Sequence, residues 1–158
     1  EFYESDKKIQ TKSFRDYATF MNIHTSEEAE FTINMTNHLP GGRDQKQTLI
    51  MNKDRFMASL SENFQVTQGA NVNYKLSGLK ISDDGTSATV NDVTFISNRI
   101  MMNGADGQKV NVDVQTQSSC EDTVVITGGS IIQIKKSTCT AESYFFPSQH
   151  QPTVSQQK

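Results

Sequence analysis

The chain has 158 residues, of which 34% are hydrophobic, and its 15 basic and 18 acidic side chains give a net charge of −3. This length suits one domain that buries roughly two thirds of the surface of its unfolded chain. The negative charge argues against a general phosphate-binding surface, so nucleic acid is not an expected partner. No stretch approaches the roughly 20 apolar residues of a transmembrane helix, so no membrane-spanning segment is expected in this sequence.

The pattern of the chain predicts a single domain over residues 9–146. Residues 1–8 are mostly charged and polar, and we expect them to be frayed. Residues 147–158 are polar and carry Pro, Gln and Ser, so we expect a disordered tail. The sequence begins with Glu1 instead of Met. We therefore expect a mature form or a fragment whose export signal or anchor has been removed.

An amphipathic helix is predicted from about Ile9 to Asn22. Apolar side chains recur there at the spacing of one helical face: Phe14, Tyr17, Ala18 and Met21. The segment His24–Glu30 is predicted to be a connector. Within it, Thr25 followed three residues later by Glu28 has the pattern of a capping box, which predicts one short helical turn.

A β-hairpin and a second helix are predicted next. Apolar and polar residues alternate over 31–36, and the return strand is predicted at 47–51, after a turn rich in Gly. Asn52 is a favourable N-cap, and Asp54 lies in the first turn, where the helix dipole favours a negative charge. These signals predict a helix from about Lys53 to Phe64.

The rest of the chain is predicted to form about four long strands. The alternation of apolar residues changes phase at Ser77-Gly78 and again near Asn91-Asp92, and each change predicts a β-bulge. Turns are predicted at Asp83–Thr86 and at 103–107, where Gly residues are flanked by Asp and Asn.

The last two strands are predicted to form a long hairpin over 109–142, with a tight turn at Gly128-Gly129. Folding about this turn brings Cys120 and Cys139 within about two residues of facing each other, an offset that one β-bulge would absorb. Two cysteines allow one pairing, so we expect a Cys120–Cys139 disulfide. A disulfide implies an oxidising compartment, and hence a periplasmic or secreted protein.

This order of elements resembles the nuclear-transport-factor-like superfamily, which includes SnoaL-like and ketosteroid-isomerase-like domains. The segments that carry the resemblance are FRDYATFM, IMNKDRFMASLSENF, LKISDDGTSATVNDVTF and DTVVITGGSIIQIKKSTC. In the last segment, Ile131 or Ile132 stands where the family usually has Trp. The resemblance covers about residues 9–142 and implies an α+β cone, in which helices close a strongly curved antiparallel sheet. The chain most resembles exported bacterial members of unassigned function.

The resemblance also implies a conical pocket between helices and sheet. Eight side chains are expected to point towards it: Tyr17, Met21, Phe31, Met51, Phe56, Leu60, Val93 and Phe95. The simpler alternative is that these residues only form the core. The first functional hypothesis is therefore a non-enzymatic domain that binds a small apolar ligand in the cone. A protein partner, including a second copy of the chain, could instead bind the open face of the sheet.

Two alternatives remain open. Ketosteroid-isomerase-like enzymes pair a Tyr on the first helix with an Asp base, which implies isomerase or dehydratase chemistry with Tyr17 as the oxyanion donor. The corresponding base would fall near Arg43-Asp44, in an exposed turn that would not raise the basicity of a carboxylate. Periplasmic components of VirB-type secretion systems also have this fold, so an assembly role is the other alternative.

No cofactor or metal is expected. The chain has no P-loop, dinucleotide-binding fingerprint or nucleophile elbow. Its two Asp-Gly turns do not continue into a calcium-binding loop. The histidines show no zinc-ligand spacing with each other or with the cysteines, and they are expected at surface or capping positions: His24, His38 and His150.

Overall fold

A computed structural model describes residues 14–103 and 107–147 of the chain. The predicted frayed segment, the predicted helix start at Ile9 and the predicted disordered tail beyond residue 147 lie outside the described residues. The elements are α2 (Phe14–Ile23), β1 (Thr25–Leu39), β2 (Arg43–Asn52), α3 (Lys53–Val66), β3 (Thr67–Ile81), β4 (Ser87–Asn103), β5 (Lys109–Thr127) and β6 (Ile131–Pro147). Neither described helix is long and apolar enough to cross a membrane.

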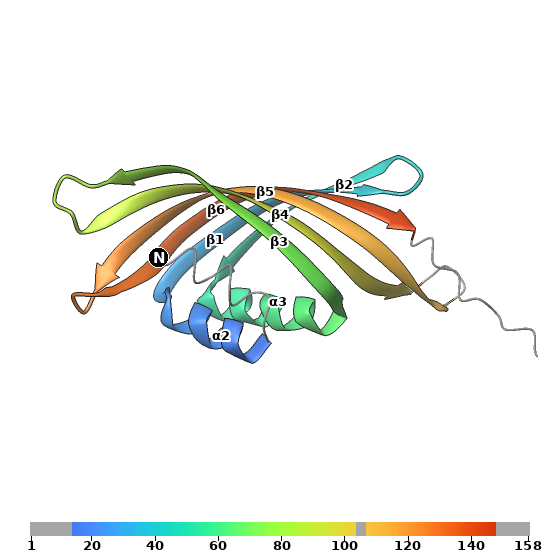
Figure 1. The fold of residues 1–158 in the computed structure, drawn as a ribbon, viewed down its shortest axis with the longest axis horizontal. Helices are drawn as coiled ribbons and strands as arrows, with labels where there is room; N and C mark the ends of the chain where they lie inside the picture. Colours follow the sequence, from blue (N-terminus) through green and yellow to red (C-terminus); the bar gives the residue numbers. More distant parts are fainter. Residues whose placement is uncertain (1–13, 104–106, 148–158) are drawn as a thin grey trace, which may run out of the picture.

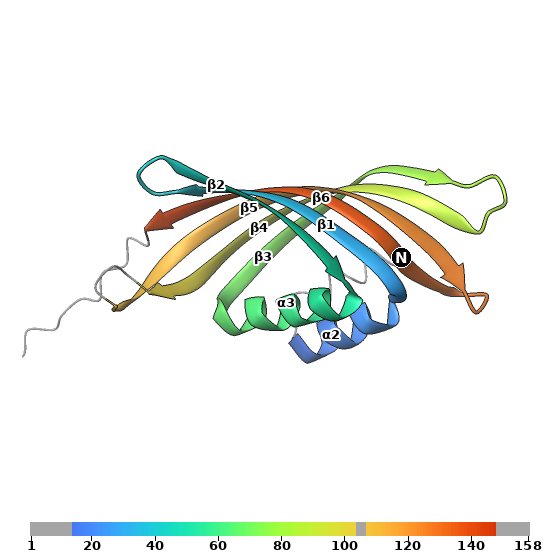
Figure 2. The same ribbon diagram turned by 180° about the vertical axis from the view of Figure 1, so that it is seen from behind.

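The strands form one curved sheet of six strands in the order β2-β1-β6-β5-β4-β3. It arches over α2 and α3 (Figure 1), which confirms the predicted α+β class and the order of helix, hairpin, helix and strands. The strand count differs from the prediction, because the hairpin β1–β2 joins the same sheet as the four later strands. The joint is a parallel pairing of β1 with β6 (Figure 2), whereas the other neighbours are antiparallel.

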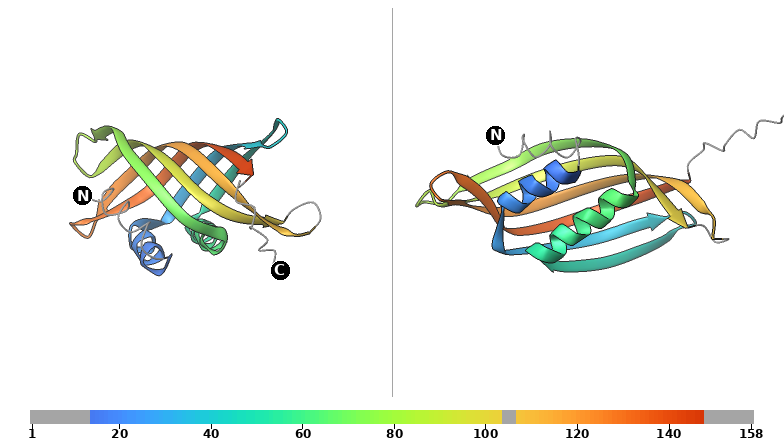
Figure 3. Two further views of the ribbon diagram at one scale, coloured as in Figure 1. Left: turned by 45° about the vertical axis from the view of Figure 1, so that its right-hand side comes forward. Right: turned by 90° about the horizontal axis from the view of Figure 1, so that it is seen from below.

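Both helices lie across the concave face of the sheet, as the view from below shows (Figure 3). The buried core joins α2 to the concave face of the sheet. Phe31 of β1 stacks on Phe56 of α3 with ring centroids 3.9 Å apart. The predicted cap of α3 is confirmed, because the Arg55 backbone N–H donates to Asn52 Oδ1 at 3.0 Å. Burying this apolar surface holds the helices against the sheet.

The predicted connector His24–Glu30 is wrong from Thr25 onwards, where β1 begins. Thr25 is fully buried and pairs with Ile134 of β6, whose N–H donates to the carbonyl of His24 at 2.8 Å. An irregularity in register lies between Thr25 and Glu30. The capping pattern of Thr25 and Glu28 is a signal between neighbouring residues. The strand β6, over 100 residues later in the sequence, instead provides the hydrogen-bond partners for the backbone of this segment.

One of the two predicted bulges is present. The β3–β4 register shifts between Leu76 and Gly78, as predicted. The second prediction, a change of phase in β4 near Asn91-Asp92, is wrong, because β4 pairs with β5 without a break from Ser87 to Asn103. The bulge therefore belongs to β3 alone, and β4 keeps one alternation throughout. Asp92 shares a face with Val90, and Val93 lies on the opposite face.

The closing hairpin has the predicted turn and the predicted cysteine pair. Gly128 and Gly129 have φ values of 56° and 79°, the left-handed region that favours glycine. Cys120 and Cys139 stand directly opposite each other, because a register shift after Thr123 absorbs the offset. They form a disulfide that links positions 19 residues apart.

Breaking this disulfide is predicted to destabilise the fold. In the chain-entropy model, a closed loop of this size stabilises the native state by about 3 kcal/mol. In urea denaturation, we expect the free energy of unfolding of the double variant Cys120→Ser/Cys139→Ser to be lower than that of the native protein by a similar amount. We expect the native protein in reductant to have the same free energy of unfolding as the variant. A reduced protein, with both thiols titrated, that keeps the stability of the oxidised one would contradict the prediction.

Candidate functional site

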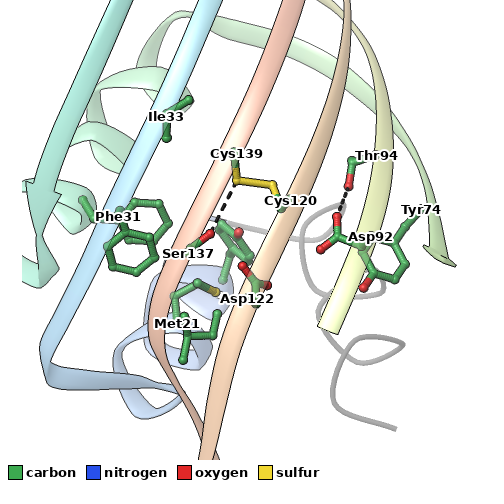
Figure 4. Close-up of a pocket in the computed structure, with 13 residues that line it drawn as sticks. Met21, Phe31, Ile33, Tyr74, Asp92, Thr94, Cys120, Asp122, Ser137 and Cys139 are labelled. Atoms are coloured by element: carbon green, nitrogen blue, oxygen red, sulfur yellow. Dashed lines mark hydrogen bonds between the residues drawn. A yellow bond between two sulfur atoms is a disulfide. The ribbon is translucent and has the colours of Figure 1, made fainter. Parts of the chain in front are cut away.

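A cavity of about 150 Å³ lies between the concave face of the sheet and the helices. Its apolar lining comes mainly from Tyr17, Met21, Phe31, Ile33, Phe56 and Ile134. Its polar lining comes from Tyr74, Asp92, Thr94, Asp122 and Ser137, and the Cys120–Cys139 disulfide forms part of the wall (Figure 4). The cavity is therefore apolar on the helix side and polar along β4, β5 and β6.

Strand alternation places two carboxyl groups at this cavity. Asp92 of β4 pairs with Cys120 of β5, and Asp122 lies two residues further along β5, on the same face. The two carboxyl groups are therefore diagonal neighbours on adjacent strands, a relation in which side chains interact. Asp92 is 4% exposed and Asp122 is 5% exposed. Both are much more buried than Asp residues usually are.

The environment favours the neutral form of Asp92. Burial, and secondly the charge of Asp122, raise the pKa of Asp92 from 3.8 to about 6. A hydrogen bond donated by the Thr94 hydroxyl at 3.4 Å acts in the opposite direction and is too long to compensate. Asp92 thus takes up a proton near pH 6, about two units above the pKa of an ordinary Asp.

The structure brings together half of the side chains that were predicted to face a pocket. Tyr17, Met21, Phe31 and Phe56 line the cavity. Met51 is buried in the adjoining core, and Leu60 packs against that core, but neither lines the cavity.

Val93 and Phe95 are corrected by the structure. They lie on the opposite face of β4 from Asp92, and Phe95 is 47% exposed. The prediction assumed that apolar residues of β4 must face the core and therefore required a change of phase near residue 92. Because the β4–β5 ladder is unbroken, Asp92 faces the core, and Val93 and Phe95 face away from it.

Sequence reasoning missed most of the polar side of the cavity, including its titratable residues Asp92, Asp122 and Tyr74. Unbroken alternation along β4 would have placed Asp92 on the same face as Val90 and Thr94. That placement puts a carboxyl group in the core, against the usual preference of Asp for the surface. The predicted Cys120–Cys139 pairing would have located Asp122, because a residue two positions along a strand lies on the same face.

Asp44, the residue near the base position implied by the resemblance, lies away from the cavity. Its side chain is 51% exposed and interacts with His38 Nδ1 at 2.9 Å. The His38 ring stacks on Tyr144 at 4.4 Å, on the face of β1 opposite Phe31 and Ile33. Within residues 14–103 and 107–147, no three His, Cys, Asp or Glu side chains converge as metal ligands would.

Comparison with known proteins identifies the fold. No family model and no curated protein matches the chain. A conserved protein from Planctomyces limnophilus DSM 3776 is similar in structure, with a TM-score of 0.57, 12% identity and coverage of 92% of this chain and 94% of that one. A hexachlorocyclohexane dehydrochlorinase (LinA) of type 2 gives a TM-score of 0.57 at 13% identity and covers 97% of this chain and 90% of its own. At such identities the likeness concerns the fold alone, and it confirms the nuclear-transport-factor-like architecture.

The buried carboxyl pair predicts a specific dependence of stability on pH. The folded-state pKa of Asp92, about 6, exceeds the ordinary 3.8. The native state therefore binds this proton more tightly than the unfolded state, and stability falls as pH rises from about 4 to above 6. The full loss is about 3 kcal/mol.

We expect Asp92→Asn to remove this loss, so that the variant is more stable than the native protein at pH 8 and similar to it at pH 4. Thermal unfolding monitored by circular dichroism across this range measures the effect. Glu121→Gln is the matched control, because Glu121 is exposed on the opposite face of β5. Parallel pH profiles for the native protein and Asp92→Asn would contradict the assignment.

Proposed function

We propose that the protein binds a small molecule in the cavity between the sheet and the helices. The observation that carries this proposal is a cavity of about 150 Å³ with apolar walls and two buried carboxyl groups at one side. An apolar cavity of this size accommodates about one benzene ring. The ligand is therefore a molecule of about single-ring size, with an apolar body and a polar end.

The energetic cost of the carboxyl pair supports a functional role. Burial disfavours the ionised form of Asp92, and the nearby charge of Asp122 adds repulsion. Apolar residues at positions 92 and 122 would pack the same space without that cost. Groups that oppose stability and lie beside a cavity are typical of binding and catalytic sites.

A second candidate is acid–base catalysis on the bound molecule. It is favoured by the raised pKa of Asp92, because a carboxyl that titrates near pH 6 both accepts and returns protons efficiently near neutral pH. Tyr17 and Tyr74 place phenol groups in the same lining, where a hydroxyl could stabilise developing negative charge. One structure of the same fold is named a dehydrochlorinase, which supports an isomerase- or elimination-type reaction as this second candidate.

We also infer that the protein works in an oxidising compartment. The support is the disulfide between directly opposed Cys120 and Cys139. Disulfides persist in periplasmic and secreted proteins and are rare in the cytosol.

Filling the cavity is predicted to weaken binding. Ser137 is 7% exposed and lines the cavity, so Ser137→Leu places a larger side chain in it. Thr138→Leu is the matched control, because Thr138 is exposed on the other face of β6. In ligand-observed NMR with a library of single-ring compounds, we expect binders of the native protein to bind Thr138→Leu equally and Ser137→Leu at least about tenfold more weakly.

Equal binding of the same compounds to all three proteins would place the site elsewhere. A library without a single binder to the native protein would overturn small-molecule binding. For the catalytic candidate, turnover that survives Asp92→Asn unchanged would exclude Asp92 as the acid–base group.

A further inference from the structure

We propose that the Cys120–Cys139 disulfide is a reactive group of the cavity and exchanges with a small thiol bound there. In this exchange Asp92 supplies the proton that the leaving sulfur of Cys120 takes up. The apolar body of the thiol, of single-ring size, lies against the stacked rings of Phe31 and Phe56. This inference rests on the proposed function and specifies its ligand class.

The disulfide is accessible from the cavity. Both cysteines line the cavity of about 150 Å³. Each of them is partly exposed, whereas Val124 and Ile134 on the same two strands are buried. A thiol that enters the cavity therefore meets a sulfur atom, and such access is one of the conditions that decide how fast a disulfide exchanges.

The flanking strands decide which sulfur is attacked. A thiolate approaches in line with the S–S bond, from the side opposite the sulfur that leaves. Cys139 pairs with Ile33 of β1. Cys120 pairs with Asp92 of β4, so the carboxyl lies at the other end of the disulfide (Figure 4). A thiolate that approached Cys120 would meet this carboxyl, whereas Cys139 is approached from the apolar side of the cavity, so Cys120 is the leaving sulfur.

The hydroxyl of Ser137 favours attack on the same sulfur. Ser137 Oγ lies 3.5 Å from Cys139 Sγ, and the hydroxyl is the donor of this contact, because a disulfide sulfur carries no proton. The contact withdraws electron density from Cys139 Sγ and makes it more susceptible to a nucleophile. Ser137 also pairs with Phe31 of β1, so the aromatic wall lies beside the sulfur that is attacked.

Asp92 is placed to protonate the sulfur that leaves. Directly opposite residues on antiparallel strands have Cβ atoms about 5 Å apart, so the Asp92 carboxyl and the Cys120 sulfur are neighbours. The pKa of Asp92 is raised to about 6, and an ordinary Cys thiol has a pKa of about 8.5. The proton therefore moves from the carboxyl to the thiolate of Cys120 as that thiolate is released.

The atoms and electrons of the exchange balance. The attacking thiolate, whose proton has gone to solvent, forms a bond to Cys139 Sγ, and the old S–S bond breaks with its electron pair on Cys120. Asp92 transfers its proton to this sulfur and becomes a carboxylate. A second thiol then displaces Cys139, which takes a proton from solvent. In sum, two small thiols and one protein disulfide become one small disulfide and two protein thiols.

The proton donor makes the exchange depend on pH. The titratable groups that face Asp92 across the cavity are Asp122 from β5, Tyr74 from β3 and Tyr17 from α2. The described lining from β1, β6 and α3 consists of apolar and hydroxyl side chains and the disulfide. As pH falls through about 6, Asp92 gains its proton, so the donor appears and the negative charge beside Cys120 disappears. The rate constant per thiolate therefore rises as pH falls.

Exchange with benzyl mercaptan tests the proposal. The reference is the same protein unfolded in urea, because it holds the same disulfide without the cavity. Mass spectrometry of acid-quenched samples measures the rate at which the mixed disulfide forms. At pH 6.5 we expect the folded protein to react with benzyl mercaptan at least about tenfold faster than the unfolded protein. Glutathione, a tripeptide too large for the cavity, should react more slowly with the folded protein than with the unfolded one.

Matched variants separate proton donation from shape. For the native protein we expect the rate constant per thiolate to be about tenfold higher at pH 5 than at pH 8, and Asp92→Asn should remove this difference. Glu121→Gln should keep it, because Glu121 is exposed on the opposite face of β5. Peptide mapping after alkylation of the released thiol should find benzyl mercaptan on Cys139 and the alkyl group on Cys120.

The other outcomes overturn the proposal in distinguishable ways. A folded protein that exchanges more slowly than the unfolded one with both thiols would show that the disulfide is protected. A rate that does not depend on thiol concentration would show that exchange follows global unfolding. Benzyl mercaptan attached mainly to Cys120 would disprove the assigned direction and the role of Asp92.

Failure of the exchange is distinguishable from failure of the proposed function. Single-ring compounds that bind the native protein and bind Ser137→Leu more weakly would leave small-molecule binding intact, while slow exchange disproves the thiol class. Slow exchange together with a library that contains no binder would remove the proposed function as well.

Discussion

The parallel pairing of β1 with β6 is the interaction on which the rest of the structure depends. α2 leads directly into β1, and α3 follows β2, so both helices are attached to the half of the sheet that this pairing joins to the later strands. Two side-chain contacts extend this pairing beyond the backbone hydrogen bonds. His24 Nδ1 lies 2.7 Å from the Ile132 carbonyl oxygen. The Gln133 side-chain amide donates to the Ile23 carbonyl at 2.9 Å. Without this pairing, the helices would not lie over β4 and β5, and the carboxyl groups there would face solvent instead of a cavity.

The disulfide reinforces the sheet where the carboxyl pair weakens it. Cys120 faces Asp92 on one side and Cys139 on the other, so the covalent link lies in the same row of residues as the buried Asp92. The loss attributed to the raised pKa of Asp92 and the gain attributed to the disulfide are each about 3 kcal/mol, so they are of the same order. The disulfide joins β5, which carries Asp122, to β6, whereas β4 with Asp92 is held to β5 by the backbone ladder alone.

Local signals in the sequence were sufficient for much of the fold and insufficient for the site. Four features follow from a few neighbouring residues, and each is confirmed: the Asn52 cap, the Gly128-Gly129 turn, the bulge at Ser77-Gly78 and the cysteine register.

The strand at 25–30 was missed because its partner is distant in sequence. Asp92 was missed because hydrophobic patterning assigns the apolar Val93 to the core, whereas the ladder with β5 decides which face each residue takes. A functional carboxyl in a strand breaks the pattern that locates strands, so such residues are hidden by the same rule that finds the fold.

Fold stability is coupled to the ionisation of Asp92 in the cavity. Burial, and secondly the charge of Asp122, disfavour the ionised form of Asp92, so the native state loses stability as the proton of Asp92 is released above about pH 6. A ligand that interacts more favourably with the ionised form of Asp92 would offset part of this loss, and the offset would grow with its occupancy. The same linkage would serve a catalytic site, in which the proton held by Asp92 moves to and from the substrate. In both cases the function would draw on a group without which the fold would be more stable, and the cost of that group falls at the cavity rather than in the rest of the core.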